Sequence, residues 1–357
     1  MNLARTPPPG TAARTAPRNA VPATGPARGP QVRWLLAAVT VLVLLTGASL
    51  AIGARGLDLG TVGQALTGFD PASGDHAVVH ARIPRTILGL LAGGALGLAG
   101  AAMQGVARNP LADPGILGIN AGAALAIVTG IYVFGVTTLT GYIWFAFLGA
   151  AAAAVVVYVI ASLGRDRATP VKLALAGAAL SAGLSSLTNV ILVSSRDTLD
   201  RFRFWQVGGI AGRDWAVIVP ALPFLLLGAA MVLCTGRILN NLALGDDLAR
   251  GLGQRVGLSR GLSALGIVLL CGSATALAGP IGFVGLVVPH AVRFLTGPDY
   301  RWILPFSLVL APALLLAADV AGRVILLPGE VPAGILTALL GAPVFVWLIR
   351  RGKAAGL

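Results

Sequence analysis

Long apolar runs separated by short polar connections follow one another along most of the chain. The stretch from Pro114 to Gly164 contains no Asp, Glu, Lys or Arg. It is long enough for two bilayer crossings and a turn, because one crossing needs about 20 apolar residues. A helix also satisfies its own backbone hydrogen bonds in lipid. The pattern therefore predicts an all-α polytopic membrane protein with about ten transmembrane helices. The predicted spans are Trp34–Ala54, Thr86–Val106, Gly115–Val136, Tyr142–Leu163, Leu173–Ser194, Ala216–Thr235, Gly261–Gly279, Gly282–Phe294, Trp302–Ala321 and Val331–Ile349.

The eighth run, Gly282–Phe294, is too short to cross a bilayer by itself. Gly279 and Pro280 precede it, so we expect a helix that begins inside the membrane, and Pro289 predicts a bend in that helix. With this run included, the number of spans is even, and both termini lie on the same side of the membrane.

Charge identifies that side as the cytoplasm. Only 11% of the residues are charged, compared with about 25% in soluble domains. The segments assigned to the cytoplasm carry 18 Lys or Arg and 5 acidic residues, whereas the external segments carry 8 of each. This positive-inside bias accounts for the net charge of +13. Nucleic acid is therefore not expected as a partner.

Composition divides the chain into three parts. Residues 1–32 are rich in Pro, Ala and Arg, contain no acidic residue and show no hydrophobic period, which predicts a disordered cytoplasmic tail. Residues 33–351 form the predicted membrane domain, and residues 352–357 form a short cytoplasmic C-terminal tail. The first apolar run, Trp34–Ala54, is too long for the core of a signal peptide, so we interpret it as the first transmembrane helix.

The predicted spans contain few residues suited to catalysis, ion coupling or metal binding. Asp319 is the only deep acidic residue, and its spacing to Arg323 predicts an i,i+4 ion pair. The sequence has no Gly-x-x-x-x-Gly-Lys-Ser/Thr nucleotide loop and no nucleophile–base arrangement, so we do not expect an enzyme. Cys234 and Cys271 stand alone in apolar runs, so no metal site or cofactor is expected.

If the chain is a pump, its energy must come from a partner. The alternative is a secondary transporter or channel that works alone, which needs an ion-coupling residue inside the membrane. A membrane-embedded enzyme is a third and weaker possibility, because it lacks a catalytic arrangement.

The polar connection 236–260 is the longest internal connection between spans. Leu244, Leu248 and Leu252 recur in it at i,i+4 spacing, which predicts a short amphipathic helix. Asp246 lies near the N-terminus of this helix, where the helix dipole favours negative charge. The segment is either an ordinary surface helix or a lever that presses into a groove of a motor subunit.

The connection after the second span predicts a tight internal turn. Asn109, Pro110 and Asp113 favour turns, and Pro114 suits the first turn of the next span, which begins at Gly115. If the chain forms a transport path, we expect this turn to flank its internal mouth.

Several short motifs occur in order along the membrane domain. They are Arg82-Ile83-Pro84-Arg85-Thr86, the segment from Gly97 to Gly118, the segment from Leu242 to Gly253, the segment from Gly279 to His290 with Arg293, and the segment from Glu330 to Thr337 with Gly341-Ala342-Pro343. Each motif alone is weak, but together and in this order they are specific. From about Trp34 to Arg351 the chain resembles the FecCD-type permeases of ATP-binding-cassette importers, which carry iron–siderophores, haem and cobalamin.

The resemblance implies a permease subunit that translocates an iron(III)–siderophore complex across the plasma membrane of a bacterium by alternating access. Haem and cobalamin are alternative cargoes. The implied partners are two ATPase subunits, a second permease copy or a paralogue, a periplasmic or lipid-anchored substrate-binding protein, and membrane lipid.

The resemblance also implies sites. The ATPase-coupling helix would comprise Leu242, Ala243, Leu244, Gly245, Asp246, Leu248, Ala249, Leu252 and Gly253. Arg82, Arg85 and Arg323, at the outer ends of two spans, are expected to dock the substrate-binding protein. The alternative for these arginines is snorkelling to the membrane interface or structural pairing, such as that of Arg323 with Asp319.

Overall fold

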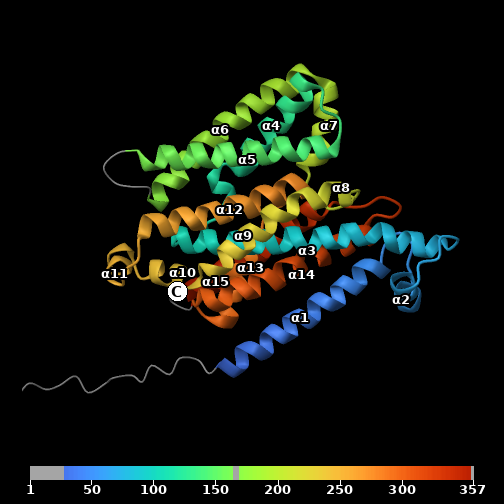
Figure 1. Ribbon diagram of the computed structural model, residues 1–357, viewed down its shortest axis with the longest axis horizontal. Helices are drawn as coiled ribbons and strands as arrows, with labels where there is room; N and C mark the ends of the chain where they lie inside the picture. The colour runs from blue at the N-terminus through green and yellow to red at the C-terminus, as the bar shows by residue number, and fades with distance from the viewer. Residues whose placement is uncertain (1–27, 164–168, 355–357) are drawn as a thin grey trace, which may run out of the picture.

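The chain folds into a bundle of long helices (Figure 1). The computed structural model describes residues 28–163 and 169–354, and each regular element in these ranges is a helix. The elements are α1 (Arg28–Ala51), α2 (Leu59–Thr67), α3 (Gly74–Ala107), η1 (Pro114–Leu117), α4 (Ile119–Phe134), α5 (Leu139–Ser162), α6 (Pro170–Ser194), α7 (Arg196–Gln206), α8 (Trp215–Ile218), η2 (Val219–Ala221), α9 (Leu222–Cys234), α10 (Gly236–Ala243), α11 (Asp246–Gly251), α12 (Val256–Ala278), α13 (Val284–Thr296), α14 (Tyr300–Ile325) and α15 (Ala333–Ala354).

The predicted tails fall mostly outside the described residues. This is true of residues 1–27 and 355–357. Helix α1 begins at Arg28, so it includes the predicted boundary of the membrane domain at residue 33, and that boundary stays a prediction.

The predicted spans correspond to helices. Among the described residues, seven helical segments are long and apolar enough to cross a membrane, namely α1, α3, α5, α6, the α8–α9 segment, α12 and α14. The shorter apolar helices α4, α13 and α15 occupy the remaining predicted runs. The prediction of an all-α polytopic membrane protein is therefore confirmed.

Helix α3 differs from its prediction. It spans 34 residues from Gly74 and so starts well before the predicted beginning at Thr86. The side chain of Ser73 accepts a hydrogen bond from the backbone N–H of His76 and caps this earlier start. The apolar run is shorter than the helix, because the outer turns carry arginines. Arg82 therefore lies within a helix and not in a loop.

The two ends of the bundle are distinct. The start of α1, the end of α15 and the short helices α10 and α11 lie at one end, on the left in Figure 1, while α2, α7 and α8 lie at the other. This arrangement places both ends of the described chain on the same side. The positive-inside bias identifies this side as cytoplasmic.

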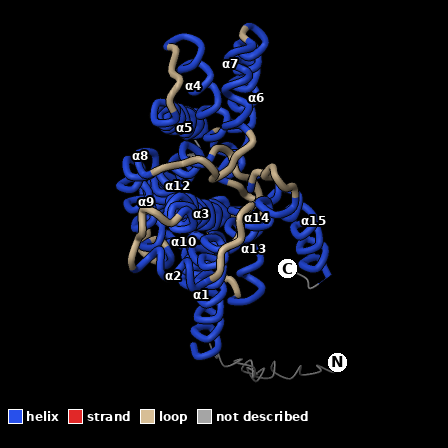
Figure 2. The backbone as a smooth tube through the Cα atoms, turned by 90° about the vertical axis from the view of Figure 1, so that its right-hand side faces the viewer, coloured by secondary structure: helices blue, strands red, loops and turns tan. Residues whose placement is uncertain are grey.

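Helix α3 lies at the centre of the bundle, next to α12 and α14 (Figure 2). Its contact with α14 is unusually close, because a Cβ at Gly93 would collide with the backbone of Pro312, and one at Gly97 with the backbone of Ser307. Small residues permit this approach of helix backbones in lipid.

Helix α13 begins inside the bundle, as predicted. Its N-cap, Phe283, has a left-handed backbone (φ 67°), and Gly285 in its first turn lies against the backbone of α3 near Leu96 and Gly100. The helix also contains Pro289. The connection from α12 therefore enters the bundle before the polypeptide continues towards the cytoplasmic side.

Candidate functional site

The connection predicted to contain one amphipathic helix contains two. α10 ends at Ala243, α11 begins at Asp246, and Gly245 between them has φ +104° and ψ 157°. Glycine is essentially the only residue that adopts this backbone conformation. The prediction of helical structure was correct, but a continuous helix was wrong because Gly245 interrupts it. We call residues 236–253 the cytoplasmic segment.

The cytoplasmic segment has a buried face and an exposed face. Leu242 and Ala249 are fully buried against the bundle. Leu244, Leu248 and Leu252 are instead 58%, 61% and 63% exposed. One exposed leucine is ordinary on a protein surface, but a cluster on a short projecting segment is typical of a surface that another protein covers.

Asp246 connects the cytoplasmic segment to two transmembrane helices. Its carboxylate accepts hydrogen bonds from both terminal nitrogens of Arg260 on α12, at 2.8 and 3.1 Å. It also pairs with Arg108 at the end of α3, at 3.3 Å. These charged contacts join α11 to α3 and α12.

Asn240 connects the same segment to α14. Its side-chain amide donates to Asp299 Oδ1 at 2.6 Å, and its side-chain oxygen accepts from the backbone N–H of Tyr300 at 2.8 Å. Hydrogen bonds from the side chain of Arg301, supported by Asn240, lower the pKa of Asp299 to about 2. Asp299 is therefore fully ionised at neutral pH and holds the start of α14 against α10.

The predicted internal turn is present between α3 and α4. It contains Asn109, Pro110, Asp113, Pro114 and Gly115. Arg108 ends α3 in a left-handed conformation (φ 49°). The side chain of Asn109 then accepts from the N–H of Leu111 at 2.9 Å, and the side chain of Asp113 accepts from the N–H of Gly115 at 2.7 Å. Arg108 also contacts the cytoplasmic segment, so the turn and that segment are adjacent. Its place beside a transport path stays a prediction.

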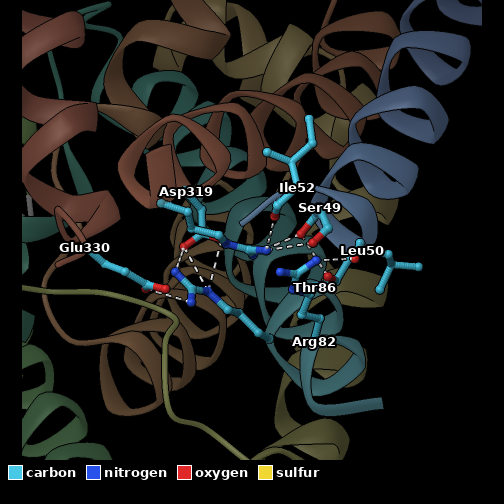
Figure 3. Close-up of polar contacts among 9 residues, drawn as sticks. Ser49, Leu50, Ile52, Arg82, Thr86, Asp319 and Glu330 are labelled. Atoms are coloured by element: carbon cyan, nitrogen blue, oxygen red, sulfur yellow. Dashed lines mark hydrogen bonds and ion pairs between the residues drawn. The ribbon is translucent and has the colours of Figure 1, made fainter. Parts of the chain in front are cut away.

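A buried charge cluster lies at the opposite end of the bundle (Figure 3). Asp319 on α14 is its centre and has a 2% exposed side chain. Arg85 on α3 donates to both carboxylate oxygens at 2.8–3.2 Å. Arg323 donates to one of them from Nε at 2.9 Å and also from Nη2, which confirms the predicted i,i+4 pair. Glu330 completes the cluster by pairing with Arg85 at 2.8 Å.

Two arginines, Arg82 next to this cluster and Arg323 within it, also bind the end of α1 and the residues just after it. Arg82 donates to the carbonyl oxygens of Leu50, Ala51 and Arg55 at 2.6–2.9 Å. Arg323 donates to the carbonyl oxygen of Ser49 at 2.6 Å. The last carbonyl groups of a helix lack partners within the helix, so these guanidinium groups cap α1 and join it to α3 and α14.

The structure separates the arginines that were predicted to dock a partner. Arg82 and Arg85 are partly exposed, whereas Arg323 is only 1% exposed and its donors are used inside the protein. A side chain so deeply buried does not reach a partner protein in this structure. The structure shows Arg323 in the structural pairing that was its alternative, and its docking role stays a prediction.

The sequence analysis did not identify several residues that hold the cytoplasmic segment in place. Arg108 and Arg260 hold Asp246, and Asn240 with Asp299 holds α10. An acidic residue in a connection, together with basic residues at the ends of spans, is a weak sequence signal for the contacts of Asp246 with Arg108 and Arg260. No local sequence pattern marks the contact of Asn240 with Asp299, because the two residues are 59 positions apart.

Comparisons with known proteins agree with this architecture. A family model described as the FecCD transport family matches residues 41–351. Ferric enterobactin transport system permease protein FepD of Escherichia coli (strain K12) is 46% identical over 316 residues, which cover 88% of this chain and 94% of FepD. "Probable siderophore transport system permease protein YfiZ" of Bacillus subtilis (strain 168) is 43% identical over 325 residues, which cover 90% of this chain and 97% of YfiZ.

A solved structure is also similar. It is a transporter described as of the metal-chelate ABC type, in an inward-facing conformation, with a TM-score of 0.79 and 29% identity. The match covers 90% of this chain and 99% of the other. Sequence and fold thus agree over nearly the whole membrane domain, and the chain belongs to the FecCD transport family.

Proposed function

We propose that the chain is the permease subunit of an ATP-binding-cassette importer that carries an iron(III)–siderophore complex across the cytoplasmic membrane. One observation carries the proposal. The cytoplasmic segment exposes Leu244, Leu248 and Leu252, while its other side is fixed to α3, α12 and α14 by Asp246 and Asn240. Such a segment is suited to receive force from a separate subunit and to pass it into the membrane helices.

The energy source in this proposal is a pair of ATPase subunits that receive α10 and α11. The chain has no nucleotide-binding loop of its own. Hydrolysis would move the cytoplasmic segment and switch a path between outward- and inward-facing states by rigid-body motion. A second permease, identical or paralogous, would enclose that path from the other side, and the turn at residues 109–115 would flank its inner mouth.

The cargo is inferred from the relatives. FepD is named for ferric enterobactin and YfiZ for a siderophore. These names favour an iron(III)–siderophore over the alternatives, haem and cobalamin.

A substrate-binding protein is the proposed partner at the outer end. We assign its docking to Arg82 and Arg85, which are partly exposed. Arg323 supports them from behind, because it shares Asp319 with Arg85.

The test is uptake of an iron(III)–siderophore by proteoliposomes that contain the assembled transporter and its binding protein. Leu248→Glu places a charge on the proposed ATPase contact, so ATP hydrolysis should no longer be coupled to uptake. Leu66→Glu is the matched control, because Leu66 is 54% exposed but lies on α2 at the opposite end. Full coupling in Leu248→Glu would reject the contact. Uptake by the chain alone, without any ATPase, would favour a secondary transporter.

A further inference from the structure

A large groove runs between α5 and α12 in the cytoplasmic half of the bundle. Its volume is about 1140 Å³, and Met103 and Val106 of α3 line part of it. Ligand pockets usually measure about 300–1,000 Å³, so this space is far too large for a packing defect. It is also distinct from the charge cluster at Asp319 and from the exposed leucines of the cytoplasmic segment.

The walls of the groove are apolar and open towards the lipid. Small residues widen it, among them Ala151 and Ala154 on α5 and Ala264 on α12. Exposed apolar residues border it: Val155 and Val159 on α5, and Leu258 and Leu265 on α12. In a bilayer such a surface is matched by hydrocarbon, so the walls suit an acyl chain.

The cytoplasmic end of the groove is basic. Of the described residues that line this end, Arg250, Arg255 and Arg260 are cationic and Asp246 is acidic. Arg255 is exposed and forms no ion pair with any described residue. Basic pockets between transmembrane helices on the cytoplasmic side are suited to anionic lipid headgroups.

Two polar atoms at this end lack partners among the described residues. Arg260 is 9% exposed, and although its terminal nitrogens bind Asp246, its Nε has no acceptor. The Oε1 atom of Gln254 has no donor, although its amide nitrogen donates to the carbonyl oxygen of Ile238. Unpartnered buried polar atoms are costly. Arg260 Nε needs an acceptor such as an anion, and Gln254 Oε1 needs a donor such as a hydroxyl group.

We propose that this groove is a binding site for phosphatidylglycerol from the cytoplasmic leaflet. One acyl chain lies between α5 and α12, the phosphate faces Arg255 and Arg260, and a hydroxyl of the glycerol headgroup donates to Gln254. This lipid supplies all three properties of the groove, namely an apolar tail, a negative charge and a hydroxyl donor. Phosphatidylcholine lacks both the net charge and the hydroxyl groups.

The site is tested by native mass spectrometry of the purified full-length chain after delipidation, with phosphatidylglycerol or phosphatidylcholine added back. Phosphatidylglycerol should bind more tightly. Arg255→Gln should weaken its binding about fivefold, since one basic residue near an anionic lipid contributes about 1 kcal/mol. Arg237→Gln is the matched control, because Arg237 is exposed on α10 and does not line the groove.

A second pair of variants tests the acyl-chain site without altering charge. Ala264→Trp should fill the groove and abolish the tightly bound lipid, whereas Ala37→Trp on the exposed face of α1 should leave it in place. Size-exclusion profiles identify any variant that fails to fold. Equal binding of both lipids, or phosphatidylglycerol binding that survives both Arg255→Gln and Ala264→Trp, would overturn the proposal. Lipid binding is measured without ATPase or cargo, so its outcome is independent of the transport function.

Discussion

The buried charge cluster offers the sharpest test of how the outer end is held together. Asp319→Asn keeps the shape of the side chain but removes the negative charge shared by Arg85 and Arg323. Both guanidinium groups lose their carboxylate partner at once. Arg85 retains Glu330 at 2.8 Å, but Arg323 retains only neutral acceptors, at Ser49 on α1 and at Ile52 just after it.

The expected loss in the free energy of unfolding follows from this difference between Arg85 and Arg323. Arg323 has a 2% exposed side chain, so the variant leaves a buried cation without a counter-ion, which costs about 3–5 kcal/mol. Arg85→Gln is the matched comparison. It leaves Asp319 paired with Arg323, and it removes a group that is 15% exposed. Loss of a hydrogen bond to a charged group costs about 1.5–3 kcal/mol. We therefore expect Asp319→Asn to be the more destabilising change.

The measurement is the free energy of unfolding in mixed micelles, obtained by titration with a denaturing detergent and followed by tryptophan fluorescence. The double variant Asp319→Asn with Arg323→Gln removes both charges of the i,i+4 pair. Residues in one ion-pair network couple by about 0.5–3 kcal/mol, so the double variant should cost less than the sum of the two single variants.

Two results would refute this reasoning. If Asp319→Asn cost less than about 1 kcal/mol, the range of an exposed ion pair, the cluster would be hydrated in the protein. If the two single costs were additive in the double variant, Asp319 and Arg323 would not interact.

Two further predictions concern the two ends of the bundle. Gly245→Ala should destabilise the break between α10 and α11 by about 1–3 kcal/mol and reduce ATP-coupled uptake. Gly251→Ala, at a position with open space and no positive φ, should do neither, and equal thermal melting curves for the two variants would contradict the prediction. Arg82→Gln, whose amide can still donate to the end of α1, should slow association with the binding protein and weaken its salt dependence. An unchanged association rate in stopped-flow measurements would remove Arg82 from the docking surface.

Hydropathy was sufficient for the fold because lipid imposes a simple rule. Each crossing needs a long, largely uncharged helix, and runs such as Tyr142–Leu163, which contains no charged residue, show this directly in the sequence. The same rule fails at α3. Its outer turns contain Arg82 and Arg85, which end the apolar run, while the helix continues because those charges find partners. The partners come from distant parts of the chain and leave no local signal.

The candidate sites also differ in whether a local sequence pattern reveals them. The pair of Asp319 with Arg323 was visible because i,i+4 spacing is a local pattern. The participation of Arg85 was not, since it lies 234 residues away from Asp319. The position of the cytoplasmic segment followed from its polar composition. Its division into two helices depends on the backbone conformation of Gly245, and a glycine in a sequence permits that conformation without requiring it.

Helix α3 physically joins the two ends of the protein. At 34 residues it is about 50 Å long. It carries Arg85 of the buried charge cluster in its outer half and reaches Arg108, the partner of Asp246, at its inner end. Its backbone already touches that of α14 at Gly93 and Gly97, so the two helices have no room to approach further. Local separation would lose dense packing. Because α14 is held by Asn240 of the cytoplasmic segment and also carries Asp319, force applied at that segment acts on both helices together. A partner that displaces α10 and α11 is therefore expected to tilt α3 and α14 as one body, and the outer arginines would move with them.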